Sequence, residues 1–130
     1  MPNSIHHEIT INAAPARVFG ALTDQTQFGE LTGAPVARLS ALEGDPIELF
    51  GGHITGRNVE IVPQRRLVQA WRAASWPEGV YSIVRFELGS GDAGKTALAF
   101  DHTGFPEAAH DELDAGWHKM YWEPLARYLS

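Results

Sequence analysis

The chain has 130 residues, 44% of them hydrophobic, with a formal net charge of −6 and a pI near 5.4. This length suits one globular domain, expected over residues 1–130, and the acidic balance argues against nucleic acid or an anionic membrane surface as a partner. With no cysteine and no long apolar segment, the sequence predicts a cytoplasmic protein without disulfides, thiol chemistry or membrane insertion.

The N-terminal part predicts a strand followed by two short helices. Residues 5–11 alternate apolar and polar side chains, which is the pattern of a half-buried strand. Pro15 fits the first turn of a helix whose apolar side chains share one face, namely Val18, Phe19 and Leu22. Asp24 with Gln27 three residues later resembles a capping box, so a second helix is expected to begin there.

The middle of the chain predicts a series of antiparallel strands. Turn-rich separators containing glycine and proline divide it into short runs with strand composition. The runs cover residues 36–39, 47–50, 54–62, 67–73, 81–88 and 96–102. Because such short turns can join only antiparallel neighbours, seven strands are expected in one antiparallel sheet together with the N-terminal strand.

The stretch between two of these strands has a specific turn chemistry. Trp76 precedes Pro77 and is therefore biased toward extended backbone, and the proline fixes its own φ. Gly79 then supplies the turn that returns the chain into the next strand. We expect a hairpin here, with Trp71 and Trp76 filling the core at its corner.

The last segment changes from the period of a strand to that of a helix. Apolar side chains recur at spacings of three and four within residues 107–129, at Leu113, Trp117, Met120, Pro124 and Tyr128. Pro124 removes one backbone hydrogen bond and should bend the helix near Met120. Gly116 is expected to let the sheet approach the helix beside Trp117.

Taken together, the run from Trp71 to Gly79, the triplet Gly104-Phe105-Pro106 and the pair Gly116-Trp117 resemble the C-terminal domain of the activator of the heat-shock protein 90 ATPase. The resemblance covers residues 9–128 and places the chain in the SRPBCC superfamily, which includes START domains. It implies an α+β helix-grip fold, in which a curved seven-stranded antiparallel sheet surrounds a long C-terminal helix and encloses a cavity, with two short helices after strand one.

The resemblance also implies a stress-related or chaperone-related role, with heat-shock protein 90 as a partner. Full-length activators carry a separate N-terminal domain that the resemblance does not cover. We therefore expect a weak chaperone contact and no stimulation of the ATPase by this domain alone.

Strand and helix periodicity predicts which side chains line the ligand-binding cavity. The expected lining is Val59, Ile61, Trp71, Val84, Phe86, Leu98, Phe100, His102, Leu113, Trp117 and Tyr121. Arg57 alternates in phase with Val59 and either enters the cavity as a clamp for an anionic ligand or lies on the surface. His102 is either a hydrogen-bonded core histidine or a ligand contact.

Two functions follow from this lining. The first is a non-enzymatic binding module, without cofactor, for a small hydrophobic ligand or a protein partner. The alternative is a cyclase-like or hydrolytic enzyme that uses the same cavity, with His102, Tyr121 and Arg57 as its polar groups. A serine nucleophile has no support, because Ser75, Ser82 and Ser90 lack a nucleophile-elbow setting.

Residues 89–96 match the letters of a phosphate-binding loop, GxxxxGK[ST]. A true phosphate loop needs a helix directly after Thr96, whereas the next residues alternate like a strand. Asp92 would also repel a phosphate. The sequence therefore predicts a hairpin turn here, with Lys95 on the surface.

Metal binding is not expected. His6 and His7 are neighbours on a strand and point to opposite faces, so they cannot chelate together. His110, Asp114 and His118 share a helical stripe, but this stripe is expected to be an exposed polar face without the converging ligands that zinc needs.

Overall fold

The structure, a computed structural model, describes residues 3–129, so the first two residues and the last one of the predicted domain 1–130 lie outside it. Its described strands form one antiparallel sheet in the order β1-β6-β5-β4-β3-β2. The strands are β1 (Ser4–Ile11), β2 (Pro46–Leu49), β3 (Ile54–Val62), β4 (Arg66–Ala73), β5 (Ser82–Ser90) and β6 (Thr96–Thr103). The helices are α1 (Pro15–Thr23), α2 (Gln25–Thr32), α3 (His110–Trp117) and α4 (Glu123–Leu129), with short 3₁₀ turns at Phe50–Gly52 (η1), Asp92–Gly94 (η2) and Glu107–Ala109 (η3).

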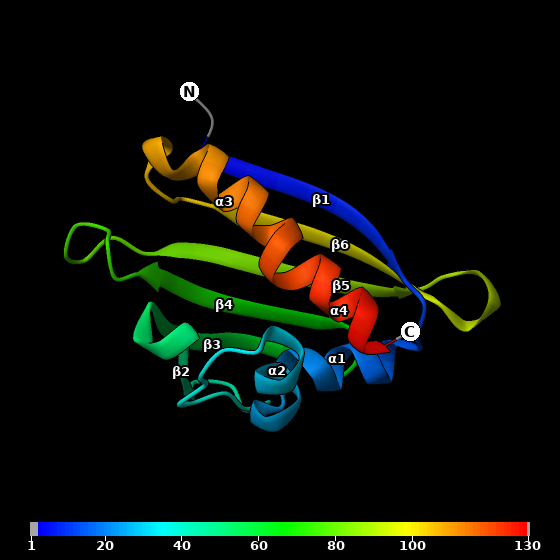
Figure 1. Cartoon of the computed structure of the whole chain (residues 1–130). Helices are drawn as coiled ribbons and strands as arrows, with labels where there is room; N and C mark the ends of the chain where they lie inside the picture. Colours follow the sequence, from blue (N-terminus) through cyan, green and yellow to red (C-terminus); the bar gives the residue numbers. More distant parts are fainter. Residues whose placement is uncertain (1–2, 130) are drawn as a thin grey trace.

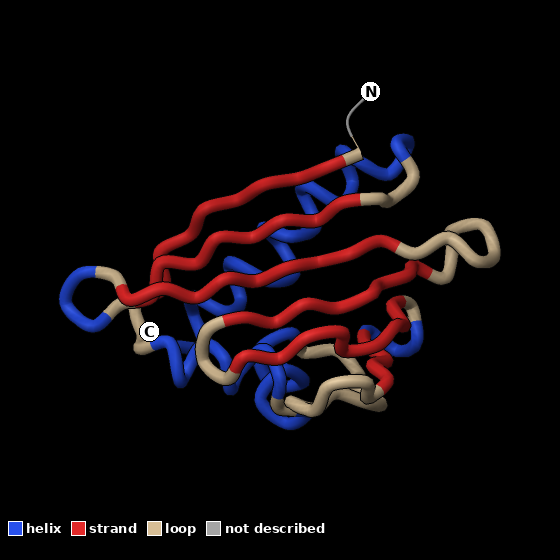
Figure 2. The backbone as a smooth tube through the Cα atoms, turned by 180° about the vertical axis from the view of Figure 1, so that it is seen from behind, coloured by secondary structure: helices blue, strands red, loops and turns tan. Residues whose placement is uncertain are grey.

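The molecule has two layers. The C-terminal helical segment runs obliquely across one face of the sheet, and α1 and α2 lie at the end where β3 and β2 form the edge (Figure 1). Seen from behind, the strands lie in front of the C-terminal helical segment, and no helix among the described residues covers this face of the sheet (Figure 2). The predicted α+β arrangement of a sheet and a C-terminal helix is confirmed.

Alternating burial shows why these residues form strands. In β4, every second side chain is buried, and in β6 the same alternation buries Leu98, Phe100 and His102. These side chains meet the C-terminal helix, whereas their neighbours face away from it. Burial of an apolar face of this kind is the main force that holds the sheet to the helix.

One predicted strand is wrong, and the sheet has six strands rather than seven. The segment 36–39 makes only an isolated bridge between Arg38 and Glu48. The N–H groups of Ala37 and Arg38 both point to the Glu48 carbonyl, at 3.0 and 3.3 Å. In a ladder, successive N–H groups point to opposite sides, so this segment lacks the extended pleat that a strand needs.

The two short helices begin where the sequence predicts. Val18, Phe19 and Leu22 of α1 are buried together in the core. The Asp24 side chain accepts a hydrogen bond of 2.9 Å from the backbone N–H of Gln27, which caps α2.

The C-terminal segment is not one uninterrupted α-helix. After η3 and α3, a π-helical turn spans His118–Trp122 before α4 begins. In this turn the N–H of Glu123 reaches back five residues, to the carbonyl of His118. Pro124 follows directly and has no N–H to donate. Where the sequence predicted a bend of the helix, near Met120, the structure has this π-helical turn.

Candidate functional site

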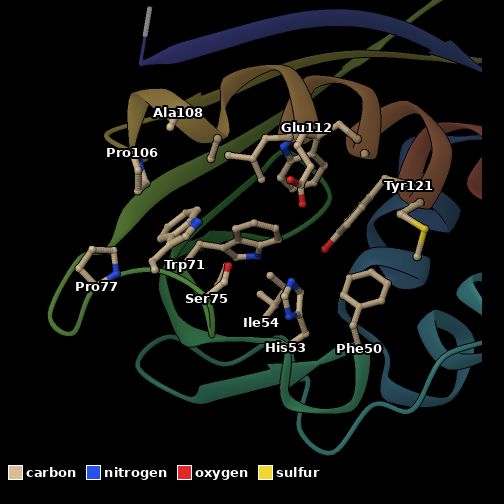
Figure 3. Close-up of a pocket in the computed structure, with 17 residues that line it drawn as sticks. Phe50, His53, Ile54, Trp71, Ser75, Pro77, Pro106, Ala108, Glu112 and Tyr121 are labelled. Carbon is tan, nitrogen blue, oxygen red and sulfur yellow. The ribbon is translucent and has the colours of Figure 1, made fainter.

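An open pocket of about 640 Å³ lies between α3 and the ends of β3 and β4 (Figure 3). This volume is in the usual range for small-molecule sites. Five of the lining residues are aromatic, and most of the others are small or apolar. The lining is Phe50, His53, Ile54, Trp71, Ala73, Ser75, Trp76, Pro77, Pro106, Ala108, Ala109, Glu112, Leu113, Gly116, Trp117, Met120 and Tyr121.

One wall of the pocket is the hairpin loop that follows β4. The Arg72 guanidinium donates hydrogen bonds to the carbonyls of Trp76, at 2.9 Å, of Val80, at 3.2 Å, and of Pro77. Gly79 supplies the positive φ of 81° that turns the chain back. Because one side chain ties three loop carbonyls together, Trp76 is held at the pocket although it lies outside any strand.

The opposite wall is α3, and Gly116 has a different role from the one expected. A Cβ built on Gly116 would meet nothing within 4 Å, so the missing side chain does not serve a close approach of the sheet. Gly116 instead lines the pocket, and the space where a side chain would lie is part of it.

The floor of the pocket is a cluster of stacked rings. The indole of Trp71 stacks on that of Trp117, with centroids 5.1 Å apart and planes inclined by 29°. Trp117 in turn contacts Phe100 and Tyr121, each at a centroid distance of 4.3 Å. Rings in mutual contact leave little freedom for rearrangement, so the floor is preformed.

Few polar groups face this space. Burial raises the pKa of Tyr121 well above its ordinary value, so its hydroxyl stays protonated, and Figure 3 shows its oxygen directed into the pocket. Ser75, His53 and Glu112 lie nearer the surface. The indole Nε1 of Trp71 is buried and has no hydrogen-bond partner among the described residues.

The structure divides the predicted lining into three groups. Trp71, Leu113, Trp117 and Tyr121 do line the pocket. Val84, Phe86, Leu98, Phe100 and His102 are buried in the core and are not among the residues that line it.

Arg57, Val59 and Ile61 form the third group, and they do not share one facing: Arg57 takes the surface alternative, and the inward facing expected of Val59 is wrong. Arg57 is exposed and donates to the Gly44 carbonyl at 2.8 Å, and Val59 is 50% exposed. A β-bulge interrupts β3 between Asn58 and Glu60. After the bulge, the partly buried Ile61 packs against the core. Before the bulge, the buried side chain is that of Asn58, so the inward positions on the two sides of the bulge are not in phase.

Sequence reasoning missed the lining supplied by loops and turns. Phe50 and His53 lie at η1, and Pro106 to Ala109 form the turn into α3. Periodicity carries no information about turns, because turns have no repeating face. The Trp76-Pro77 motif was the one available signal, since it placed a large aromatic side chain at a corner.

His102 belongs to the core and not to the pocket. Its Nδ1 accepts a hydrogen bond of 3.0 Å from the indole N–H of Trp117, so the ring proton lies on Nε2. That Nε2–H donates to the Ser82 hydroxyl at 2.6 Å, and Ser82 donates to the Trp71 carbonyl at 3.3 Å. Burial lowers the pKa of His102 to about 3, which keeps the ring neutral.

This chain of bonds runs in the wrong direction for a serine nucleophile. A catalytic histidine must take the proton of the serine hydroxyl, whereas His102 gives a proton to Ser82. Both side chains are buried, and neither lines the pocket. The His102–Ser82 pair is therefore a structural contact.

Residues 89–96 form a β-hairpin, as predicted. β5 ends at Ser90 and β6 begins at Thr96, so no helix follows the loop. The Thr96 hydroxyl is buried and donates to the Ala13 carbonyl at 2.7 Å. It is therefore not free to hold the magnesium of a bound nucleotide.

In the helical stripe of His110, Asp114 and His118, the first two residues are partly buried and His118 is exposed. Asp114 accepts a hydrogen bond of 2.7 Å from Nε2 of His7, and the His118 ring lies 4.3 Å from that of His7. Nδ1 of His7 accepts from the indole of Trp122 at 2.9 Å. These contacts fasten β1 to the helix, and within residues 3–129 no group of three His, Cys, Asp or Glu residues is arranged to hold a metal ion.

Comparison with known proteins gives a consistent result. A sequence model of the family described as "Activator of Hsp90 ATPase homolog 1-like protein" matches residues 12–130. The mouse protein "Activator of 90 kDa heat shock protein ATPase homolog 1" is 28% identical over 116 residues, which cover 89% of this chain and 34% of the relative. The chain thus spans about a third of the length of that curated relative.

Solved structures share the fold. A crystal structure of an HSP90 activator from Plasmodium falciparum superposes with a TM-score of 0.88 at 24% identity, covering 94% of this chain and 92% of that one. CalU16 from Micromonospora echinospora gives a TM-score of 0.81 at 24% identity, over 98% and 76% of the two chains.

Within residues 3–129, no helix is both long and apolar enough to cross a bilayer.

Proposed function

The chain belongs to the family of Activator of Hsp90 ATPase homolog 1-like proteins, and on this basis we propose that it is a non-enzymatic binding module whose pocket holds a small hydrophobic ligand. One observation carries the proposal: the pocket between α3 and the sheet has five aromatic side chains in its lining. Apolar surface of this kind, left in water, favours the burial of an apolar guest.

The polar groups near the pocket support binding rather than catalysis. His102 donates to Ser82 and is held neutral, so it does not act as a base. Tyr121 keeps its proton, so its hydroxyl is available for hydrogen bonding and not as a phenolate base. Arg57 lies in another surface hollow, with Pro46 and Tyr81, and does not reach the pocket. The three polar groups required by the enzymatic alternative are therefore not brought together.

A chaperone contact is the second part of the proposal. The names of the similar mouse protein and of the Plasmodium falciparum structure both state activation of heat-shock protein 90. Because the chain corresponds to about a third of the mouse relative, we infer weak binding to the chaperone without stimulation of its ATPase.

The ligand proposal is tested at Gly116, where a new side chain enters the pocket and meets no protein atom at its Cβ. The uncharged fluorophore N-phenyl-1-naphthylamine should bind the wild-type protein saturably. Gly116→Leu should weaken this binding at least about tenfold, because the leucine occupies the pocket. The variant should be as stable as the wild type or more so, since replacing a glycine within a helix gains about 0.5–1 kcal/mol.

Two variants serve as controls for this experiment. Gly116→Ala should retain most of the binding, because one methyl group fills little of the pocket. Ala115→Leu adds the same leucine on the neighbouring exposed position and should leave binding unchanged. Failure of the wild type to bind the fluorophore, or equal binding by Gly116→Leu, would contradict the proposed function.

A further inference from the structure

Trp71, in the floor of the pocket, has an unsatisfied hydrogen-bond donor. Its side chain is only 4% exposed, and its Nε1–H has no acceptor among the described residues. The indole N–H groups of Trp117 and Trp122, by contrast, donate to His102 and His7. A buried donor without an acceptor is unfavourable, so this group is poised to take one.

The protein side of Trp71 offers no acceptor. Its ring stacks on Trp117 at 5.1 Å and meets His102 edge-on at 5.2 Å. Both nitrogens of His102 are already bonded. Figure 3 shows Trp71 lying among the lining side chains, between Ser75 and Tyr121. Because Trp71 lines the pocket, a molecule bound there can supply the acceptor that the described residues lack.

The charge of the pocket restricts that acceptor. No Lys or Arg is among the described residues that line it, and Glu112 adds an acidic group. A carboxylate or phosphate would be desolvated there without a partner cation, next to a residue of like charge. A neutral carbonyl oxygen accepts the same hydrogen bond without this cost.

We infer that, within the binding function proposed above, the pocket takes a planar, uncharged aromatic molecule whose carbonyl oxygen accepts the hydrogen bond of Trp71 Nε1–H. Flat aromatic walls favour a planar guest. The Tyr121 hydroxyl, which is directed into the same space, is a second donor that such an oxygen could share.

The first test observes the hydrogen bond directly in the wild-type protein. The chain has four tryptophans, so a ¹⁵N-labelled sample gives four indole N–H signals, and Trp71→Phe identifies the one from Trp71. The probes are 2-acetylnaphthalene and 2-ethylnaphthalene, which share a ring system but differ in the carbonyl. The ketone should move the Trp71 indole proton downfield, and the hydrocarbon should not.

The same spectra contain their own control. The indole protons of Trp117 and Trp122 already have acceptors, so neither probe should shift them downfield in the same way. A Trp71 indole proton that responds alike to ketone and hydrocarbon would overturn the inference.

The second test measures affinity. The preference for 2-acetylnaphthalene over 2-ethylnaphthalene should be about 3- to 10-fold greater in the wild type than in Trp71→Phe, which keeps an aromatic ring but lacks the N–H. The anion 2-naphthoate should bind the wild type at least about tenfold more weakly than the ketone. Tighter binding of the anion would contradict the neutral acceptor.

The outcomes separate this inference from the function on which it rests. If both naphthalenes bind and the preference is the same in Trp71→Phe, the carbonyl inference fails while the binding function stands. If neither naphthalene binds while N-phenyl-1-naphthylamine does, the inference also fails and the binding function stands. If none of the three binds the wild type, the proposed function itself fails. A folded Trp71→Phe is required to assign the indole signal and to measure the affinity ratio, whereas the indole shift itself is measured in the wild-type protein.

Discussion

At the scale of single residues, hydrogen-bond direction decides what His102 does. The sequence placed this histidine on the inner face of its strand, in phase with Leu98 and Phe100, and the structure confirms that facing. Its role could not be read from spacing, because the two partners that fix its proton come from other elements. Trp117 supplies the donor and Ser82 the acceptor.

Burial of His102 should make stability depend on pH. The folded ring protonates only near pH 3, whereas the unfolded ring protonates near pH 6.5. The unfolded state therefore binds more protons between these values, so the free energy of unfolding should fall as the pH drops below about 6.5. Between pH 7 and pH 5 the loss from this group should be about 2 kcal/mol.

The variant His102→Gln isolates this effect, because glutamine keeps a donor and an acceptor but does not titrate. Urea unfolding at pH 7 and pH 5 should show a drop about 2 kcal/mol smaller for the variant than for the wild type. His6, whose pKa is raised by Glu8 and Asp101, is present in both proteins and cancels in the comparison. If the free energy of unfolding fell by the same amount with pH in the two proteins, His102 would not be held neutral by burial.

At the scale of elements, β3 shows where sequence-based prediction succeeds and where it fails. Its bounds, Ile54–Val62, were predicted without error from its composition and flanking turns. The facing of its side chains was not, because the bulge after Asn58 reverses the alternation. A bulge is set by pairing with the neighbouring strand, and the sequence of β3 alone does not reveal it.

Gly56 lies in β3, just before that bulge, and is paired with Trp71 of β4. A Cβ on Gly56 would lie 1.9 Å from the carbonyl oxygen of Ala70, which no real contact allows. Gly56→Ala should therefore destabilise the protein by about 2–3 kcal/mol, because both strands must move apart. Gly56 pairs with Trp71, so the displacement should also weaken ligand binding in the pocket.

A matched control is available in β5. At Gly89 an added Cβ would lie at an ordinary distance of 3.6 Å from the Ala97 carbonyl oxygen. Gly89→Ala should change the free energy of unfolding by no more than about 0.5 kcal/mol, as at most sites without a specific clash. Equal stability losses for the two alanine variants in urea unfolding would mean that the strands are not closely apposed at Gly56.

At the scale of the whole molecule, the sequence predicted the arrangement well and the site in part. Strand alternation, turn chemistry and the 3.6-residue period of the last segment are local properties, and they predicted six of the strands, the two short helices and the C-terminal helical segment. The pocket forms where a loop, a 3₁₀ turn and a helix converge, and that convergence is a property of the assembled fold. Only the lining residues that lie on regular strands and helices, such as Trp71 and Trp117, could be predicted from sequence periodicity.

The family relationship leads to a prediction about the chaperone. The purified chain, added to heat-shock protein 90 at micromolar concentration, should leave its ATPase rate unchanged, because one weak contact has no second site to raise its effective concentration. The assay should include a full-length activator as a positive control. Robust stimulation by the 130-residue chain would show that this region alone carries the activity.

The central claim is that the pocket between α3 and the sheet is the binding site. Its most direct test is a titration of the ¹⁵N-labelled wild-type protein with N-phenyl-1-naphthylamine, followed through the backbone amide signals. Perturbed signals should cluster at residues 53–54, 71–76 and 108–121, and they should disappear in Gly116→Leu. Perturbations centred instead on the hollow near Arg57 and Tyr81, or persisting in Gly116→Leu, would contradict the account.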